Sequence, residues 1–483
     1  MRWSTLPVVT VRRWDSVKLE HEAIGLKTGA EVPMIMNRKI FFCGIGGAGM
    51  SPLARLMAQR GYSVFGSDRS YDLGRNASLF ALLKKEGITL VPQDGTSIDA
   101  SIDTFVVTRA VEESVPDIKR AVDLKLKILK RPRFMAEVFK DTKNIAVGGT
   151  SGKSTTTGMI GHILQVTGKS PTIMNGAVMI NGETNFVSGA SDIAVFEADE
   201  SDGFEDVISV CPAAMAVLTN ISLDHFELDE LKEMFSEFLK KAPLGAVLNA
   251  DCENSMALLG CNPKTVTFGT SPKATFSLAS ISPSLSIPGQ HNELNALAAI
   301  AACSLLGIST ADSLEALETF RGIKRRLEVV GEPRGIRVID DFASNPGKIA
   351  ASLKVAIAGS RRAFVVFQPH GFQPTKMMKE GYIETFSATL RPADMLLMPD
   401  IFYVGGSVNL VNGEVVALPK DISSQDVVEP VAKRGREAHY IPKREDIIPF
   451  LKRSAQPGDA VIVMGSRDES LSDFAKEIAL ALV

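Results

Sequence analysis

Residues 143–156 read KNIAVGGTSGKSTT, an apolar strand followed by a glycine-rich loop and the start of a helix. In such a loop the backbone N–H groups surround phosphates, Lys153 neutralises them and the Ser154 hydroxyl can bind Mg²⁺. Three residues separate Gly148 from Gly152, one fewer than in the common form of this loop. Because strand, glycines, lysine and helix coincide, the stretch predicts a nucleotide-binding α/β domain. A chance turn with a solvated lysine is the weaker alternative.

A second glycine loop lies nearer the N-terminus. Residues 44–50 read GIGGAGM, a G-x-G-x-x-G pattern between a predicted strand at 40–43 and a predicted helix at 50–60. Glycines let the backbone approach a diphosphate, and the helix N-terminus supplies N–H groups. Asp68 ends the next strand, where an acid can accept a hydrogen bond from a ribose hydroxyl. The loop favours a diphosphate ligand, with a NAD site and a purely structural turn as alternatives.

The same strand and helix rhythm continues along the chain and predicts three α/β domains, as the length of 483 residues also does at ~150 residues per domain. We expect a Rossmann-like domain, a central P-loop ATPase-type parallel sheet and a second Rossmann-like domain. Their predicted bounds are 1–36 for an N-terminal extension, then 37–140, 141–315 and 316–483. The other predicted strands are 62–66, 104–108, 193–197, 213–218, 245–249, 337–340, 364–367, 395–398 and 460–464, with a core-facing helix at 228–240 and a helical stretch at 292–320.

The composition excludes several classes of protein. The 53 Lys and Arg against 56 Asp and Glu give a net charge of -3, so no global positive field attracts nucleic acid or an anionic membrane. No run reaches the ~18 apolar residues that cross a bilayer, and no signal peptide is evident. The five cysteines form no C-x-x-C pair, which favours a reducing compartment. We therefore expect a cytoplasmic protein without membrane insertion or a nucleic-acid partner.

Polar side chains follow two predicted strands of the central domain. Residues 196–202 read FEADESD, and carboxylates such as that of Glu197 can bind Mg²⁺ or its ligands where parallel strands end. One or two of these acids are expected to be plain surface residues. Residues 219–225 read TNISLDH, and His225 could ligate or orient a group beside a metal site. A structural histidine is the alternative.

Further candidates lie in the last third of the chain. In residues 288–295, PGQHNELN, the amides of Asn292 and Asn295 share one helical face and could read a base edge. Helix capping is an equally good explanation. Residues 340–346, DDFASNP, end a strand in two acids before an Asn-Pro turn, and Arg326 could bind a transferred phosphate. A surface ion pair is the alternative for this arginine.

The order GIGGAGM, GGTSGKSTTT, EADESD, TNISLDH, GQHNELNA, FRGIKRR and DDFASNP resembles the Mur ligase family of peptidoglycan synthesis. The resemblance runs from about Asn37 to the C-terminus, is strongest to the alanine-adding and murein-peptide-recycling members, and includes the short phosphate loop. It implies an ATP- and Mg²⁺-dependent ligase for cell-wall biogenesis. The carboxylate of UDP-N-acetylmuramate would attack the γ-phosphate of ATP, and an amino acid, with L-alanine favoured, or a short peptide would displace phosphate from the acyl phosphate. The alternatives are a recycling ligase or a paralogue with an altered acceptor and, in another class, a NAD-dependent oxidoreductase.

The resemblance also implies roles for individual residues. The UDP-sugar site would contain Gly44, Gly46, Gly47, Gly49 and Asp68. The ATP site would contain Gly149, Thr150, Gly152, Lys153, Ser154, Thr155, His291, Asn292, Asn295, Arg326 and Asp341. The metal site would contain Ser154, Glu197 and His225, and the catalytic set would be Lys153, Glu197, His225 and Arg326.

This chain departs from the family pattern at two places. Members that add alanine usually have two histidines where this chain has Ser344 and Asn345, and an arginine where it has Gly371. Both places lie in the domain that would present the incoming amine. We therefore expect activation of the carboxylate to survive while acceptor binding is weak or altered, unless Lys348, Lys376 or a group of backbone N–H donors replaces the lost guanidinium.

Overall fold

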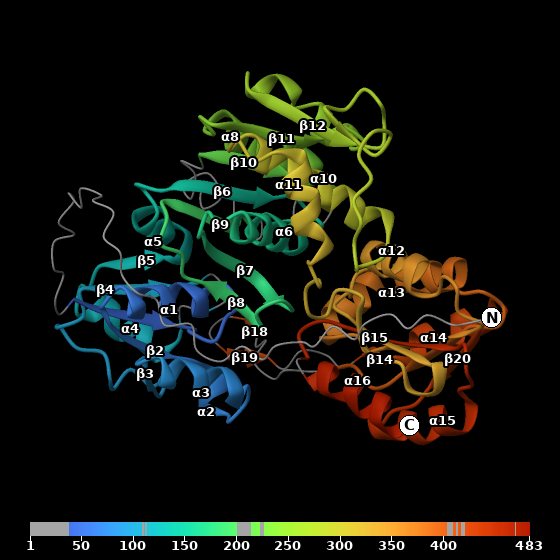
Figure 1. The fold of residues 1–483 in the computed structure, drawn as a ribbon. Helices are drawn as coiled ribbons and strands as arrows, with labels where there is room; N and C mark the ends of the chain where they lie inside the picture. Colours follow the sequence, from blue (N-terminus) through green and yellow to red (C-terminus); the bar gives the residue numbers. More distant parts are fainter. Residues whose placement is uncertain are drawn as a thin grey trace, which may run out of the picture. The chain divides into compact units, whose positions relative to one another are not determined.

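The computed structural model describes residues 38–108, 111, 114–199, 214–222, 227–402, 409–411, 414–416, 421–468 and 470–483. The predicted N-terminal extension, 1–36, lies outside them. Three sheets, each mostly or wholly parallel, follow one another along the chain (Figure 1). A small hairpin of β18 (Asn409–Val411) and β19 (Glu414–Val416) is separate from them. Among these residues no helix is both long and apolar enough to span a membrane.

The first sheet is built around a strand that is apolar on both faces. Phe41 and Phe42 of β1 (Lys39–Cys43) point to opposite sides, where Phe41 stacks on Phe105 and Phe42 meets the edge of Phe134. Such a strand needs helices on both faces, as in parallel sheets generally. The all-parallel order is β3-β2-β1-β4-β5. The other elements are α1 (Met50–Gln59), β2 (Ser63–Ser67), α2 (Arg69–Asp72), α3 (Ala77–Lys85), β3 (Thr89–Val91), β4 (Thr104–Val107), α4 (Pro116–Asp123), β5 (Ile128–Lys130) and α5 (Arg131–Val138).

The second sheet has β6 (Lys143–Gly148) near its centre, in the order β13-β12-β11-β10-β6-β9-β7-β8. Only β8 pairs antiparallel, with β7. Ile145 and Val147 pack against α6 (Lys153–Val166) and α10 (Gln290–Ser304), while Ala146 faces the buried stripe of α8 (Leu228–Lys240). The other elements are β7 (Thr172–Met179), β8 (Thr184–Val187), β9 (Ile193–Glu197), β10 (Met215–Leu218), β11 (Gly245–Asn249), α9 (Glu253–Met256), β12 (Thr265–Gly269), β13 (Phe276–Ser277) and α11 (Thr310–Glu318).

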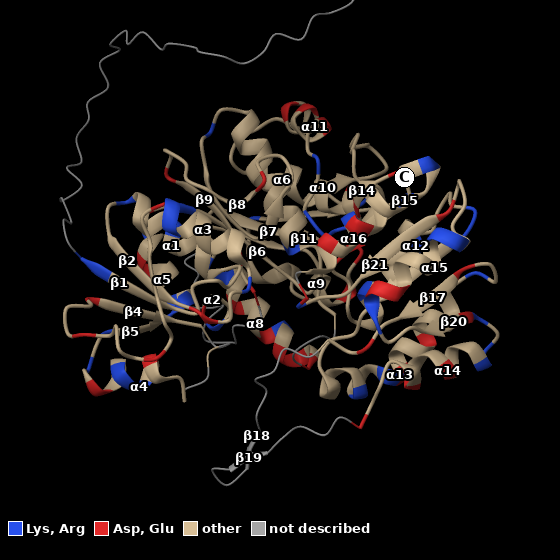
Figure 2. Ribbon diagram, turned by 90° about the horizontal axis from the view of Figure 1, so that it is seen from below, with Lys and Arg blue, Asp and Glu red and all other residues tan. Residues whose placement is uncertain are grey.

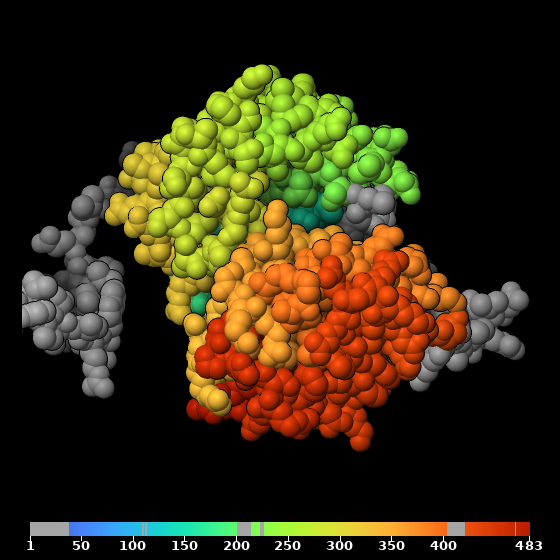
Figure 3. Space-filling model, turned by 90° about the vertical axis from the view of Figure 1, so that its right-hand side faces the viewer, coloured from blue at the N-terminus to red at the C-terminus, as the bar shows by residue number. Residues whose placement is uncertain are grey.

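The third sheet has the order β14-β15-β21-β16-β17-β20, with only β14 antiparallel. Alternate strand residues point to opposite faces. Ile339, Val365 and Ile462 pack under α12 (Pro346–Ala356), α13 (Phe372–Thr389) and α14 (Gln425–Lys433), and the alternate positions pack under α15 (Ile447–Ser454) and α16 (Ser470–Ala481). These helices form one packed body, orange to red in Figure 3. The strands are β14 (Glu328–Gly331), β15 (Arg337–Asp341), β16 (Ala363–Phe367), β17 (Met395–Met398), β20 (Glu437–Tyr440) and β21 (Ala460–Met464).

Basic and acidic residues are interspersed over the helices and loops of all three sheets (Figure 2). The predicted fold class is confirmed. The helical stretch predicted at 292–320 consists of two helices, α10 and α11, because the chain turns at Gly307 with φ +81° and Ser309 caps α11 by accepting from the N–H of Asp312 at 3.0 Å. The strand predicted at 213–218 corresponds to β10, which begins at Met215, and residue 213 lies outside the described residues.

Candidate functional site

The loop between β6 and α6 requires its glycines. Gly149 has φ +118° and Gly152, the residue before α6, has φ +88°. A Cβ atom at Gly149 would lie 2.3 Å from Oγ1 of Thr219, and one at Gly152 would lie 2.5 Å from Oδ1 of Asn295. Both the left-handed backbone and the close packing therefore exclude side chains here.

Two residues after β10 hold this loop in place. The Thr219 hydroxyl donates to the Ser151 carbonyl at 2.6 Å, and the Asn220 amide donates to the same oxygen at 2.9 Å. The Ser151 N–H donates in return to Asn220 Oδ1 at 3.1 Å. Neither residue was predicted to belong to the site, although the two begin the TNISLDH motif. His225 of that motif lies outside the described residues, so no geometry accompanies its predicted role.

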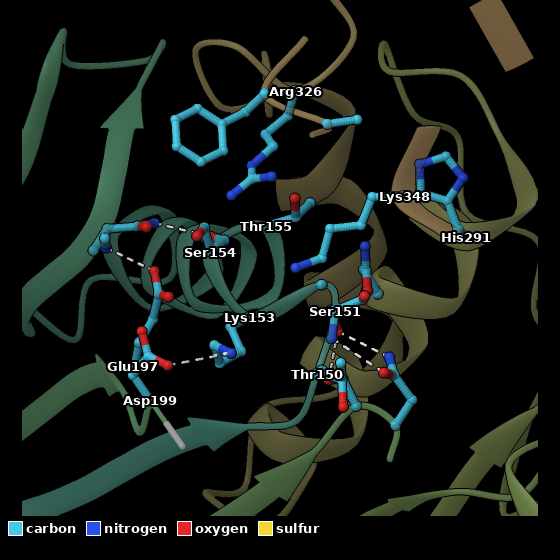
Figure 4. A pocket seen from close by; sticks show the side chains of 18 of the residues that line it. Thr150, Ser151, Lys153, Ser154, Thr155, Glu197, Asp199, His291, Arg326 and Lys348 are labelled. Atoms are coloured by element: carbon cyan, nitrogen blue, oxygen red, sulfur yellow. Dashed lines mark hydrogen bonds and ion pairs between the residues drawn. The ribbon is translucent and has the colours of Figure 1, made fainter. Parts of the chain in front are cut away.

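Lysine 153 is the first residue of α6, and its side chain turns back to the loop (Figure 4). Its Nζ donates to the Gly149 carbonyl at 2.8 Å and is 3.7 Å from Oδ1 of Asp199. Glu197, at the end of β9, accepts from the Gly176 N–H at 2.6 Å, and a Cβ at Gly176 would come within 2.7 Å of that carboxylate. The acidic motif thus places two carboxylates beside the loop. Its other acids, at 200 and 202, lie outside the described residues.

The start of α10 packs against the same loop. Asn295 Oδ1 accepts from the Thr156 hydroxyl at 3.3 Å, and the Asn292 amide donates to the Pro288 carbonyl at 2.7 Å. Neither asparagine is the N-cap, which is Gly289. Burial lowers the pKa of His291, and the nearby negative charge of Asp341 only partly opposes this shift. The imidazole of His291 is therefore neutral at pH 7.

Arg326 reaches the cavity from a strained turn. Its neighbours Arg325 and Leu327 both have left-handed backbones, with φ +59° and +51°, and its guanidinium lies 5.1 Å from the centre of the Phe342 ring. The buried Asp341 carboxylate accepts from the Leu327 N–H at 2.8 Å, which fixes this turn. Asp341 also accepts from the Ala343 N–H and the Ser352 hydroxyl, each at 2.9 Å. Burial raises the pKa of Asp341 against these hydrogen bonds.

The phosphate loop, the start of α10 and the Arg326 turn border one cavity of about 970 Å³, and residues of the first domain also line it. Arg326, Lys348 and Lys153 all extend into it (Figure 4). Lys348, named above as a possible replacement for the missing guanidinium, lies in the first turn of α12, where Asn345 is the N-cap and accepts from the Lys348 N–H at 2.8 Å. The predicted site residues on its wall are Gly49, Thr150, Gly152, Lys153, Ser154, Thr155, Glu197, His291, Asn292, Asn295, Arg326 and Asp341.

The first glycine loop reaches the cavity at Ala48 and Gly49, and Gly44, Gly46, Gly47 and Asp68 lie outside its lining. The Asp68 carboxylate turns back on the loop and accepts from the N–H groups of Gly46 and Ser70, both at 2.8 Å. A Cβ at Gly46 would lie 2.9 Å from Asp68 Oδ2. In this structure Asp68 therefore holds the loop in its conformation, whereas the sequence pattern predicted that its carboxylate would contact a ribose hydroxyl.

Comparison with known proteins agrees with this three-part arrangement. Residues 39–143 match the Mur ligase family catalytic domain, 147–303 the Mur ligase middle domain and 325–467 the Mur ligase glutamate ligase domain. A UDP-N-acetylmuramate–L-alanine ligase of Geobacter sulfurreducens is 33% identical over 460 residues, which cover 89% of this chain and 94% of the relative. The chain belongs to the Mur ligase family. The family resemblance and the ligase class predicted from the sequence are thereby confirmed.

Other Mur ligases give the same result. A relative of the same name from Geotalea uraniireducens is 32% identical over 456 residues, covering 89% of this chain and 95% of the relative. The crystal structure of the UDP-N-acetylmuramate-alanine ligase of Thermotoga maritima matches with a TM-score of 0.72 and 27% identity, covering 92% of this chain and 98% of that one. A murein peptide ligase of Psychrobacter arcticus shares the fold, with a TM-score of 0.63, 23% identity and coverage of 92% and 98%.

The two departures from the Mur ligase pattern have structural roles in this chain. Asn345 is the N-cap of α12, and the carbonyl of Ser344 accepts from the Tyr382 hydroxyl at 2.7 Å. Gly371 precedes α13 with φ +70°, a backbone that disfavours any side chain. Lys376, one of the three possible replacements for the missing guanidinium, pairs with Asp421.

Proposed function

We propose that this Mur ligase joins L-alanine to the carboxylate of UDP-N-acetylmuramate in the cytoplasm, with hydrolysis of ATP to ADP and phosphate, during peptidoglycan synthesis. The observation that carries the proposal is the single cavity that the phosphate loop, the Arg326 turn and Gly49 share. A ligase of this type must hold a nucleotide, an acyl donor and an amine together. The relatives named as alanine ligases match nearly their whole length, which supports the same substrates here.

The proposed ATP site follows from the phosphate loop. The N–H groups of the loop would surround the phosphates, with Lys153 on the β and γ groups and Arg326 on the γ-phosphate from the opposite wall. Phosphoryl transfer needs positioned cations more than a nucleophilic side chain, and both of these lie in the cavity. His291, Asn292 and Asn295 would border the nucleotide at the start of α10. For Asp341, the contacts with Leu327, Ala343 and Ser352 support a positioning role, and the predicted ribose contact is the alternative.

Magnesium fits the oxygen donors beside the loop. The Ser154 hydroxyl and the Glu197 carboxylate line the cavity, and the described residues contain no cluster of three or more His, Cys, Asp or Glu that could hold a metal alone. Mg²⁺ is commonly bound through one or two carboxylates together with phosphate oxygens and water. We therefore propose that Ser154 and Glu197 hold Mg²⁺ on ATP, with His225 as the predicted third group. The ion would neutralise charge on the phosphates.

The three domains would divide the substrates among them. We propose that 37–140 binds the UDP-sugar through Gly44, Gly46, Gly47 and Gly49, with Asp68 holding the loop in shape, that 141–315 binds ATP, and that 316–483 presents the amine. Gly49 lies at the edge of the cavity, so a ligand on this loop could reach the phosphates. The oxidoreductase alternative explains neither the phosphate loop nor the third domain. An altered acceptor or a recycling role is the second candidate, and it rests on Ser344, Asn345 and Gly371.

The direct experiment is phosphate release from ATP by the full chain with UDP-N-acetylmuramate and a panel of amines. The panel contains L-alanine, glycine, L-serine and L-alanyl-D-glutamyl peptides, and product masses are measured. Phosphate release that requires both the sugar nucleotide and L-alanine, with the matching product mass, supports the proposal. Efficient use of a peptide with L-alanine rejected supports the recycling role. A Lys153→Met variant is the control for phosphate released by a contaminant.

A further inference from the structure

The proposed reaction requires a site for the carboxylate of the incoming amino acid. The amine must lie next to the activated acyl group, near Arg326 and the phosphate loop, so the carboxylate must bind close to the Arg326 wall. A guanidinium is the side chain best suited to hold it, because it donates two parallel hydrogen bonds. Gly371 offers no side chain for this purpose, and Lys348, which lines the cavity, carries a point charge without the two parallel donors, so a guanidinium must come from elsewhere in the third domain.

Two arginines near the ends of the central strands already bind protein groups. Arg325 donates to the Gly465 carbonyl at 2.7 Å and lies 3.3 Å from Oδ1 of the buried Asp340. Arg444 lies 2.7 Å from Oδ2 of Asp468. Moving either guanidinium away would leave a buried carboxylate without its positively charged partner, which destabilises the folded protein. Neither guanidinium is therefore available to a substrate.

Arg467 differs from both. It follows β21, its side chain is exposed, and among the described residues no carboxylate lies within ion-pair distance of it. Strand β21 lies between β15 and β16 in the sheet. Arg467 follows its carboxyl end, and ligands of open α/β folds bind at the carboxyl ends of the strands. The backbone of Arg467 is left-handed, with φ +63°, a conformation that is unfavourable for a residue other than glycine.

His370 lies beside Arg467. Phe367 of β16 pairs in register with Met464 of β21, and His370 and Arg467 stand at equivalent places beyond this pair. His370 Nδ1 is 3.1 Å from the Ser466 hydroxyl. Burial lowers the pKa of His370 and the positive charge of Arg467 lowers it further, so the ring is neutral at pH 7. When Ser466 donates to Nδ1, the proton of the ring is on Nε2, which can then donate to a ligand.

Hydrogen bonds and ring contacts of Arg325 connect this pair of residues to the wall of the cavity. The Arg325 guanidinium donates to the carbonyls of Gly465 and Asp468, at 2.7 and 3.4 Å, on either side of Arg467. The guanidinium groups of Arg325 and Arg326 each lie 5.1 Å from the centre of the Phe342 ring, and Phe342 lines the cavity. The turn that carries Arg467 is therefore held against the same wall as Arg326.

We propose that Arg467 binds the carboxylate of the incoming amino acid and that His370 Nε2 donates a second hydrogen bond to it. This assignment rests on the proposed function and names the residue that determines its acceptor. Arg467 follows β21 in a left-handed turn, and its side chain is exposed. Arg467 thereby supplies, from β21, the cation that Gly371 does not supply from β16.

The test compares L-alanine with L-alaninamide, which keeps the amine and lacks the carboxylate. Both are assayed at one pH with wild type, Arg467→Met, Arg467→Lys and the control Arg453→Met, an exposed arginine at the end of α15. We expect Arg467→Met to lower kcat/KM for L-alanine about 10- to 100-fold, because a charge-assisted hydrogen-bonded pair is lost. The kcat/KM for L-alaninamide should change less than about threefold, because this substrate has no carboxylate. The kcat/KM of Arg467→Lys for L-alanine should lie between the values of wild type and Arg467→Met, because lysine keeps the charge and lacks the two parallel donors of the guanidinium.

The KM values for ATP and UDP-N-acetylmuramate, together with thermal unfolding, report whether the variants are intact. If Arg467→Met lowers activity on both amines equally, or leaves the preference for L-alanine unchanged, Arg467 does not bind the carboxylate. A wild type that makes no product with any amine contradicts the proposed function itself, and the inference with it. A working wild type with an unchanged preference in Arg467→Met contradicts the inference alone.

Discussion

Replacing Asp341 by asparagine should release the turn that carries Arg326. The carboxylate binds the Leu327 N–H through Oδ2, and the Ala343 N–H and Ser352 hydroxyl through Oδ1. An asparagine that keeps the two Oδ1 contacts must turn its NH₂ group toward the Leu327 N–H, so two donors face each other. A hydrogen bond to a charged group contributes about 1.5–3 kcal/mol, and we expect a stability loss of that size.

The same change should act on catalysis through geometry. With the Leu327 N–H unpaired, the left-handed turn relaxes and Arg326 moves away from its place over Phe342. A displacement of ~1 Å at a positioning group can cost 10²-fold in rate. We therefore expect Asp341→Asn to lower kcat about 10- to 100-fold with little change in the KM for ATP.

Steady-state kinetics and thermal unfolding of the full chain test this expectation. Ser352→Ala is the matched control, because it removes one neutral donor from the same carboxylate and should cost only about 1 kcal/mol. If Asp341→Asn instead raises the KM for ATP tenfold or more, with unchanged unfolding temperature and kcat, Asp341 contacts the nucleotide. Our account of the Arg326 turn is then refuted.

Three further predictions concern the central domain. Lys153→Met should lower kcat by at least 10²-fold, equivalent to at least ~2.7 kcal/mol of transition-state stabilisation, and near-normal turnover would show that the loop is only structural. Gly152→Ala should weaken ATP binding in a titration and lower the unfolding temperature, because the new Cβ would lie 2.5 Å from Asn295 Oδ1 on a backbone with φ +88°. Gly168→Ala is the control and should spare ATP binding, because a Cβ at Gly168 would have no neighbour within 4 Å. Burial lowers the pKa of His162 below its ordinary 6.5, so the unfolded state binds the proton first and stability falls as pH drops below 6.5. His162→Gln should reduce this slope in urea titrations between pH 7 and 5, and an unchanged slope would assign it to other groups.

Much of the fold follows from the sequence because parallel strands buried on both faces form continuous apolar runs. The strands 193–197, 245–249, 395–398 and 460–464 were predicted with the bounds that the structure shows. Short edge strands such as β3, with three residues, carry too little periodicity to be found. Neighbouring strands, rather than any local pattern, determine where such strands pair.

The site was predictable where local backbone chemistry determines it. The phosphate loop, Glu197 and the Asn292 motif carry signals within a few residues, and the structure brings them to one cavity. The support from Thr219 and Asn220, and the holding of the Arg326 turn by Asp341, depend on segments that meet only after folding. Asp68 shows the same limit, since its spacing gave no sign that both oxygens would bind the glycine loop and the next turn.

The central claim is that the carboxylate of UDP-N-acetylmuramate is activated by phosphoryl transfer in this cavity. The most direct measurement uses UDP-N-acetylmuramate labelled with ¹⁸O in both oxygens of its carboxylate, with ATP and L-alanine, and determines the mass of the phosphate released. An acyl phosphate leaves one carboxylate oxygen on phosphate when the amine attacks the acyl carbon. We therefore predict one ¹⁸O in each phosphate formed with the amide product. Phosphate that carries only solvent or ATP oxygen, while amide product accumulates, would contradict the account.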